Sequence, residues 1–167
     1  KHDWLLKNSD LNLIEEYLIK NPKIKNNDKL IKFLVDEYLS RSKLEKSCKI
    51  LSKINYPTED KYLSKFNIYC LINDNKREEA QLLFDIKTEL GFKDVFFEKK
   101  FNYLMEYDLS IDETISEKNI LNFHLSHRTN PNFVFEPNNS TSKKIWRYLS
   151  TSNLLTNLES VNLEDQQ

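Results

Sequence analysis

Apolar residues recur at the spacing of an α-helix along most of the chain. Leu11, Ile14 and Leu18 are separated by three and four residues, which places them on one helix face and predicts a helix over 9–20. Similar sets follow and predict further helices, carrying Leu30, Leu34, Val35, Tyr38 and Leu39; Leu44, Cys48, Leu51 and Ile54; Leu63, Phe66, Ile68, Leu71 and Ile72; Ala80, Leu83 and Phe84.

Two short polar segments predict helix starts. Ser42 is followed three residues later by Glu45, and Asn75 by Glu78. This spacing is typical of a capping box, in which the first side chain accepts a hydrogen bond from a free amide at the helix start. We therefore expect helices to begin at both positions.

The predicted helices repeat in pairs. Lys32-Phe33, Lys65-Phe66 and Lys100-Phe101 lie 33 and 35 residues apart, each in the first helix of a pair. The same register aligns candidate caps, small residues and large residues between the first two pairs, namely Ser42 with Asn75, Ser47 with Ala80, and Leu51 with Phe84. A period near 34 residues is the signature of helix-turn-helix repeats.

In these features residues 28–108 resemble the tetratricopeptide-like repeat family. In that family a small residue on the second helix follows a large one on the first by nine positions, as Ser47 follows Tyr38 and Ala80 follows Leu71. The resemblance implies an all-α, right-handed superhelix of antiparallel helix pairs over 1–127. The chain departs from the family pattern in having Val35 and Ile68 where a small residue is expected.

The third unit loses the pattern. A helix is predicted over 93–107, but Ile115 and Asn119 stand where the preceding pair has Ala80 and Phe84. After a further helix over 117–127, we expect an ordered loop over 128–141, held by its aromatic residues. Terminal helices of the same domain are expected over 142–167, the first capped by Ser142 and a last one around Leu154, Leu155 and Leu158.

Composition narrows the functional classes. Hydrophobic residues make up 39% of the 167 residues, which is enough for a core, and no apolar run is long enough to span a membrane. Gly91 is the single glycine, which excludes glycine-rich phosphate loops, and no other cofactor motif is present. The net charge of −1 gives no reason to expect a nucleic-acid partner.

The two cysteines leave the cellular compartment open. Cys48 lies on the second helix of one predicted pair and Cys70 on the first helix of the next, so stacking of the pairs would bring them close. One disulfide is possible, but we expect two buried thiols that act as small apolar residues.

The family resemblance also implies a partner-binding face. The positions that face the groove in tetratricopeptide-like first helices correspond to Lys32, Lys65 and Lys100 and, four residues later, to Asp36, Tyr69 and Leu104. With Tyr62, these side chains predict a groove that binds an extended, acidic peptide. Lysine is also the commonest exposed residue of this chain, so the same positions fit an ordinary solvated surface. The leading hypothesis is a non-catalytic protein-interaction or scaffold module.

A second class of protein has similar superhelical domains, namely the lytic transglycosylases that cleave peptidoglycan. The alternative hypothesis is therefore a non-catalytic part of such an enzyme. Glu159-Ser160 matches the dipeptide of their catalytic acid but lacks the surrounding sequence, so we expect no catalytic role. His124 and His127, with Glu117 two turns earlier, have a spacing that metal ligands use, although packing of the histidines is the simpler interpretation. Because the chain begins without Met, we expect it to be a piece of a longer protein.

Overall fold

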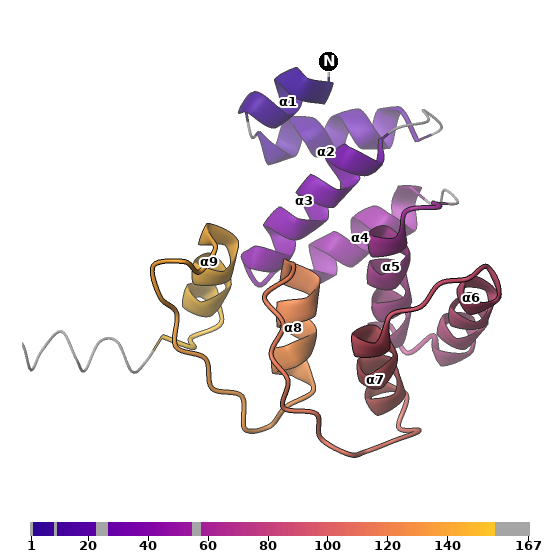
Figure 1. The fold of residues 1–167 in the computed structure, drawn as a ribbon. Coiled ribbons are helices and arrows are strands. Elements are labelled where there is room, and N and C mark those ends of the chain that lie inside the picture. The colour runs from indigo at the N-terminus through magenta and orange to yellow at the C-terminus, as the bar shows by residue number, and fades with distance from the viewer. Residues whose placement is uncertain (1, 9, 23–26, 55–57, 156–167) are drawn as a thin grey trace, which may run out of the picture.

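The computed structural model describes residues 2–8, 10–22, 27–54 and 58–155, and this part of the chain is all-α (Figure 1). It contains nine helices and no strand. Their bounds are α1 His2–Asn8, α2 Leu11–Lys20, α3 Asp28–Ser40, α4 Leu44–Ile54, α5 Lys61–Asn73, α6 Arg77–Glu89, α7 Val95–Leu104, α8 Ile120–Arg128 and α9 Lys143–Thr151. None of the helices in these residues is both long and apolar enough to cross a membrane. The predicted all-α class is confirmed, the right-handed superhelix stays a prediction, and α1 was not predicted.

Two consecutive helix pairs follow the predicted register. The first helices, α3 and α5, each have 13 residues, and three-residue links join them to α4 and α6. Small residues lie where each pair packs, because Ser47 and Ala80 are both fully buried. The Ser47 hydroxyl donates a hydrogen bond to the Val35 carbonyl oxygen at 2.7 Å. The pairing is as expected, and membership of the repeat family stays a prediction.

The predicted helix starts at Ser42 and Asn75 are wrong. Both residues have a left-handed backbone, with φ of 56° and 60°. The amides of Ser42 and Asn75 donate to carbonyls of the preceding helix, those of Leu39 and Ile72. The next amide along, that of Lys43 or Lys76, donates one residue further back, to Tyr38 or Leu71. This pair of backbone hydrogen bonds is a Schellman motif. Ser42 and Asn75 therefore end α3 and α5 and do not begin α4 and α6.

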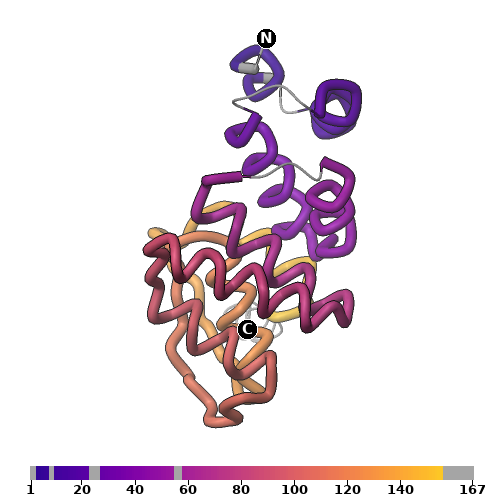
Figure 2. Tube along the Cα trace, turned by 90° about the vertical axis from the view of Figure 1, so that its right-hand side faces the viewer, coloured from indigo at the N-terminus to yellow at the C-terminus, as the bar shows by residue number. Residues whose placement is uncertain are grey.

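The array changes direction after α7. Residues 105–119 contain no helix, so α7 has no second helix of its own. Instead α8 packs on α3 and α7, and α9 packs on α3 and α8. In the view of Figure 2 the orange and yellow segments that include α8 and α9 lie behind the layer of α5 to α7. The chain therefore folds back across its own first helices.

The segment between α8 and α9 contains no helix or strand, and its aromatic rings pack on α8. The rings of Phe133 and Phe135 meet Phe123 of α8 edge-on, with centroids 5.6 and 5.0 Å apart. The Ser142 hydroxyl accepts a hydrogen bond from the Ile145 amide at 3.3 Å, which confirms Ser142 as the cap of α9. No helix includes Leu154 or Leu155, contrary to the prediction, and Leu158 lies outside the described residues.

Candidate functional site

Two lysines of the predicted groove form a ladder between neighbouring helix pairs. Lys32 of α3 forms an ion pair with Asp60, and Lys65 of α5 pairs with Asp94 at 2.8 Å. Asp60 and Asp94 are the residues that cap α5 and α7, the first helices of the following units. Each lysine therefore holds the start of the next first helix in place.

In each capping aspartate, one carboxylate oxygen caps the helix and the other forms the ion pair with lysine. In Asp94, Oδ1 accepts a hydrogen bond from the Phe97 amide at 3.0 Å while Oδ2 receives the Lys65 ammonium. Burial by itself raises the pKa of Asp94, but the bonds from Lys65 and Phe97 outweigh it and the net pKa is lowered. Asp60 has the same balance with Lys32 and Leu63. Both carboxylates are therefore stabilised in the charged form.

Lys100 is enclosed at the end of the ladder. Its ammonium donates to the carbonyl oxygen of Asp112 at 2.9 Å and lies 5.3 Å from the centre of the Phe96 ring. The residue is almost fully buried, and this burial lowers the pKa of its ammonium. Lys100 thus ties the non-helical segment after α7 back to that helix.

The remaining predicted groove residues meet α8 and α9. Asp36 accepts a hydrogen bond from the Tyr62 hydroxyl and forms an ion pair with Lys144 of α9 at 3.7 Å. Burial raises the pKa of Asp36 despite these partners. Beside it, Glu37 pairs with Arg147 of α9. Helix α9 is therefore fastened to α3 by two ionic contacts.

Tyr69 begins a chain of hydrogen bonds that links α5, α8 and α9. The Arg128 guanidinium lies beside Tyr69 and can only donate hydrogen bonds. The Tyr69 hydroxyl therefore donates its own hydrogen to His124 Nε2, which lies 2.8 Å away. His124 then donates from Nδ1 to the Tyr148 hydroxyl at 2.8 Å, and Tyr148 donates to His127 Nδ1 at 2.7 Å. The tautomers are assigned from this order of donors and acceptors. Burial lowers the pKa of His124 to about 3 and lowers that of His127 as well.

All six predicted partner-binding residues thus form ion pairs or hydrogen bonds within the chain, and Lys32 is the most open of the three lysines, with its side chain 39% exposed. The structure brings Asp36 and Tyr62 together, but it separates the three lysines into different contacts. Their binding role stays a prediction. Lys32 and Lys65 share a structural role, since each pairs with the aspartate that caps the next first helix, whereas Lys100 donates to a backbone carbonyl.

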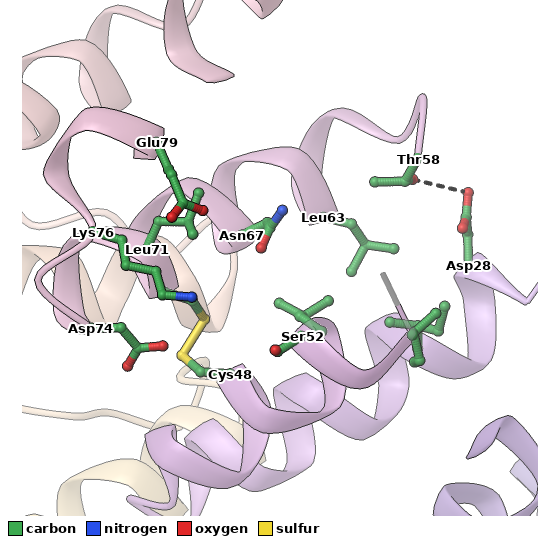
Figure 3. Close-up of a pocket in the computed structure, with 14 residues that line it drawn as sticks. Asp28, Cys48, Ser52, Thr58, Leu63, Asn67, Leu71, Asp74, Lys76 and Glu79 are labelled. Carbon is green, nitrogen blue, oxygen red and sulfur yellow. Dashed lines mark hydrogen bonds between the residues drawn. A yellow bond between two sulfur atoms is a disulfide. The ribbon is translucent and has the colours of Figure 1, made fainter. Parts of the chain in front are cut away.

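The expectation of two thiols is wrong, because Cys48 and Cys70 form a disulfide between α4 and α5, with Cα atoms 5.3 Å apart. It borders a cavity of about 380 Å³ between the two helix pairs. Figure 3 shows the disulfide at one end of the cavity, near Asp74 and Lys76, and Asp28 with Thr58 at the other. The joined sulfurs supply no thiolate nucleophile at this site.

An apolar stripe on the outer face of α6 was missed by the sequence analysis. Leu82, Ile86 and Leu90, four residues apart, have exposed fractions of 62%, 44% and 75%. Helix α6 buries its opposite face instead, where Phe84 stacks on Phe101 with ring centres 4.1 Å apart. The four-residue spacing was the signal in the sequence, because these residues lie off the face carrying Ala80, Leu83 and Phe84.

Carboxylates accompany this stripe. An α-helix turns by 100° per residue. In this projection one edge of the apolar stripe is formed by Glu78, Asp85 and Glu89, and Glu79 lies within the stripe. In the part of the chain that the structure describes, none of these four carboxylates forms an ion pair. The outer face of α6 is therefore apolar along its middle and negatively charged along its edge.

A shallow groove of about 390 Å³ extends the stripe toward the start of α6, with Met105 and Tyr107 on its far side and Leu82 on the near side. The Tyr107 hydroxyl donates to Gln81 Oε1 at 2.7 Å, which holds the ring against α6 while most of it stays exposed.

The described residues that were weighed as metal or catalytic groups do not form a metal site. His124 and His127 are engaged with tyrosines, Glu117 is exposed, and the described residues contain no group of three or more His, Cys, Asp or Glu that could hold a metal ion. Glu159 and Ser160 lie outside the described residues. Comparison of the chain with protein-family models, with curated proteins and with solved structures finds no match.

Proposed function

We propose that this chain is a non-catalytic protein-interaction module that binds a partner on the outer face of α6. The observation that carries the proposal is the stripe of Leu82, Ile86 and Leu90, three large apolar side chains exposed in a row along α6 and its C-cap residue. Isolated exposed apolar residues are ordinary, but contiguous ones mark surfaces that become covered.

The surface is placed on α6 because of how the rest of the array is packed. Helices α8 and α9 pack on α3, and α8 also packs on α7. Helix α5 is joined to α8 by the hydrogen bond between Tyr69 and His124. Helix α6 has Ala80 as its one fully buried side chain. Figure 1 shows α6 at the edge of the molecule, on the side away from α9. No other described helix packs on its outer face, so a second helix could pack there.

Burial of this stripe would supply useful binding energy. Covering large aliphatic side chains contributes up to about 1.5 to 3 kcal/mol each for complete burial, and less for side chains already half covered. An amphipathic helix laid in a groove uses such anchors at a spacing of three and four residues. The stripe on α6 has the matching spacing.

The test compares three forms of the protein as bait in a cross-linking and affinity-capture experiment on cells of its source. These are the wild type, the stripe variant L82Q/I86Q, and the control L13Q/I19Q, which removes two similarly exposed apolar side chains from α2. A protein captured equally by wild type and control, but lost with the stripe variant, is the expected result. Circular dichroism and thermal unfolding verify that all three are folded. Identical capture by all three forms would overturn the proposal.

A further inference from the structure

We infer that the partner segment that covers α6 is a basic amphipathic helix. This inference rests on the proposed function and adds the chemistry of the partner. The carboxylates of Glu78, Asp85 and Glu89 follow one edge of the stripe over three turns, without ionic partners among the described residues. A bound helix with Lys or Arg on the matching edge would pair with them.

The basic groups of α6 do not neutralise this edge. Arg77 is directed to Glu106 and to the Leu104 carbonyl oxygen, and Lys87 donates to the Thr58 carbonyl oxygen at 2.9 Å. Lys76 and Lys93 lie before and after the helix, at its two ends. The acidic edge therefore faces solvent with no cation opposite it along the helix.

The negative charge beside the stripe also favours one kind of binding partner over the others that an exposed apolar helix face could bind. A second copy packed on α6 would bring two sets of carboxylates together, and an anionic membrane surface would be repelled in the same way. A cationic helix gains attraction and breaks no ion pair among the described residues, since Asp85 has only a hydrogen bond from Gln81. Complementary charge thus favours a basic partner over self-association or lipid.

The spacing of the anchors defines the recognised segment. Leu82 and Leu90 are eight residues apart, so the stripe is about 12 Å long at 1.5 Å per residue. A partner helix of about three turns covers it, with apolar residues at positions i, i+4 and i+7 or i+8. The groove beside Met105 and Tyr107 accepts one further side chain at the end of the segment.

The experiment is a fluorescence-anisotropy titration of the whole chain with synthetic labelled 14-residue helices. One peptide has Leu at the anchor positions and Lys elsewhere on its polar face. The matched peptide has the same Leu positions with Glu in place of Lys, and a third has the Lys peptide's composition in scrambled order. We expect the ordered Lys peptide to bind at least tenfold more tightly than either of the others, and its affinity to fall as salt rises.

Variants locate the binding. The variant E78Q/D85N/E89Q neutralises the acidic edge, and we expect it to bind the Lys peptide at least tenfold more weakly and with a smaller dependence on salt. We expect L82Q/I86Q to abolish binding of the Lys peptide. The control E98Q/E113Q/E117Q removes the same charge from three exposed carboxylates elsewhere and should bind within about twofold of wild type. Equal losses in the two neutralised variants, or equal binding of the Glu peptide, would overturn the inference.

Other occupants give distinct results. Concentration-dependent dimers in sedimentation that disappear in L82Q/I86Q, or stripe-dependent binding to vesicles of anionic lipid, would overturn a basic partner in favour of self-association or lipid. If the Lys peptide fails but affinity capture still depends on Leu82 and Ile86, the charge assignment fails and the proposed function stands. If neither depends on these residues, both fail.

Discussion

Among the described residues, five end helices in a left-handed conformation, and only Gly91 of these adopts it without steric cost. The others are Ser42, Asn75, Glu106 and Asn153, all with φ near +60°. A side chain costs roughly 1 to 2 kcal/mol in this region, although Asn tolerates it better than most residues. Four of the nine described helices, α3, α5, α7 and α9, thus end in a residue that carries this steric cost.

Substitution of Asn75 tests this assignment. We expect Asn75→Gly to raise the free energy of unfolding by up to about 1 kcal/mol, because glycine removes the steric cost of φ 60°. Asn73→Gly, two residues earlier in the last turn of α5, should lower it by a similar amount. Urea unfolding measures both. A loss of stability in Asn75→Gly would favour a helix-start cap at that residue.

The lysine ladder is tested by a double-mutant cycle on Lys65 and Asp94. Lys65→Met removes the cation, and Asp94→Asn keeps an acceptor for the Phe97 amide, so the cycle isolates the ion pair from the cap. We expect a coupling energy of about 1 to 3 kcal/mol, because the Lys65 side chain is only 9% exposed.

An exposed pair supplies the reference for this cycle. Lys20 and Glu16 lie one turn apart on α2, with side chains 69% and 57% exposed. Such exposed pairs contribute little to stability, because water and salt screen the two charges. If the coupling between Lys65 and Asp94 is no larger, the ladder does not hold the helix pairs together.

Among the helices, α8 depends on neutral histidines. The unfolded chain binds a proton at His124 near pH 6.5, whereas the folded chain does so only at about 3. Protons therefore favour the unfolded state, so stability is constant above about pH 6.5 and falls as the pH drops below it. The slope for one such group is about 1.4 kcal/mol per pH unit. The groups around His124 are His127, Arg128, Tyr69 and Tyr148, none of which offers an anion at these pH values.

The measurement is urea unfolding at several pH values between 5.0 and 7.5, a range above the titration of Asp60 and Asp94, whose pKa values are lowered. His124→Gln does not titrate there, so we expect it to be less stable than wild type at pH 7.5 but to lose less stability on acidification. Parallel pH profiles for the two proteins would show that His124 is not the group responsible.

At the scale of the whole molecule, the disulfide joins the two helix pairs. Cys48 and Cys70 are 22 residues apart, and closing a loop of that length in the unfolded chain corresponds to about 3 kcal/mol in the chain-entropy model. We expect reduction by dithiothreitol to lower the free energy of unfolding by up to that amount. The variant C48A/C70A should be destabilised to a similar degree and insensitive to the reductant. Equal stability of the oxidised and reduced wild type would contradict this role.

The pairing of helices was predictable because it depends on local pattern. The apolar spacing, the 33-residue register and the placement of Cys48 and Cys70 on consecutive helices require only the 3.6-residue period and short links. The helix ends were less predictable. Ser42 and Asn75 fit a cap and a left-handed turn equally well by composition, since Ser and Asn serve in both.

Local residue spacing was enough to predict the successive helix pairs, the incomplete third pair and a helix capped by Ser142. The return of α8 and α9 across α3, and the burial of Lys65 and Lys100 with oxygen partners, depend instead on how distant segments pack. The reason is physical: helix formation follows from residues within a few positions of one another. Asp36 with Lys144 and Tyr69 with His124 are joined across many residues by packing, which no local spacing specifies.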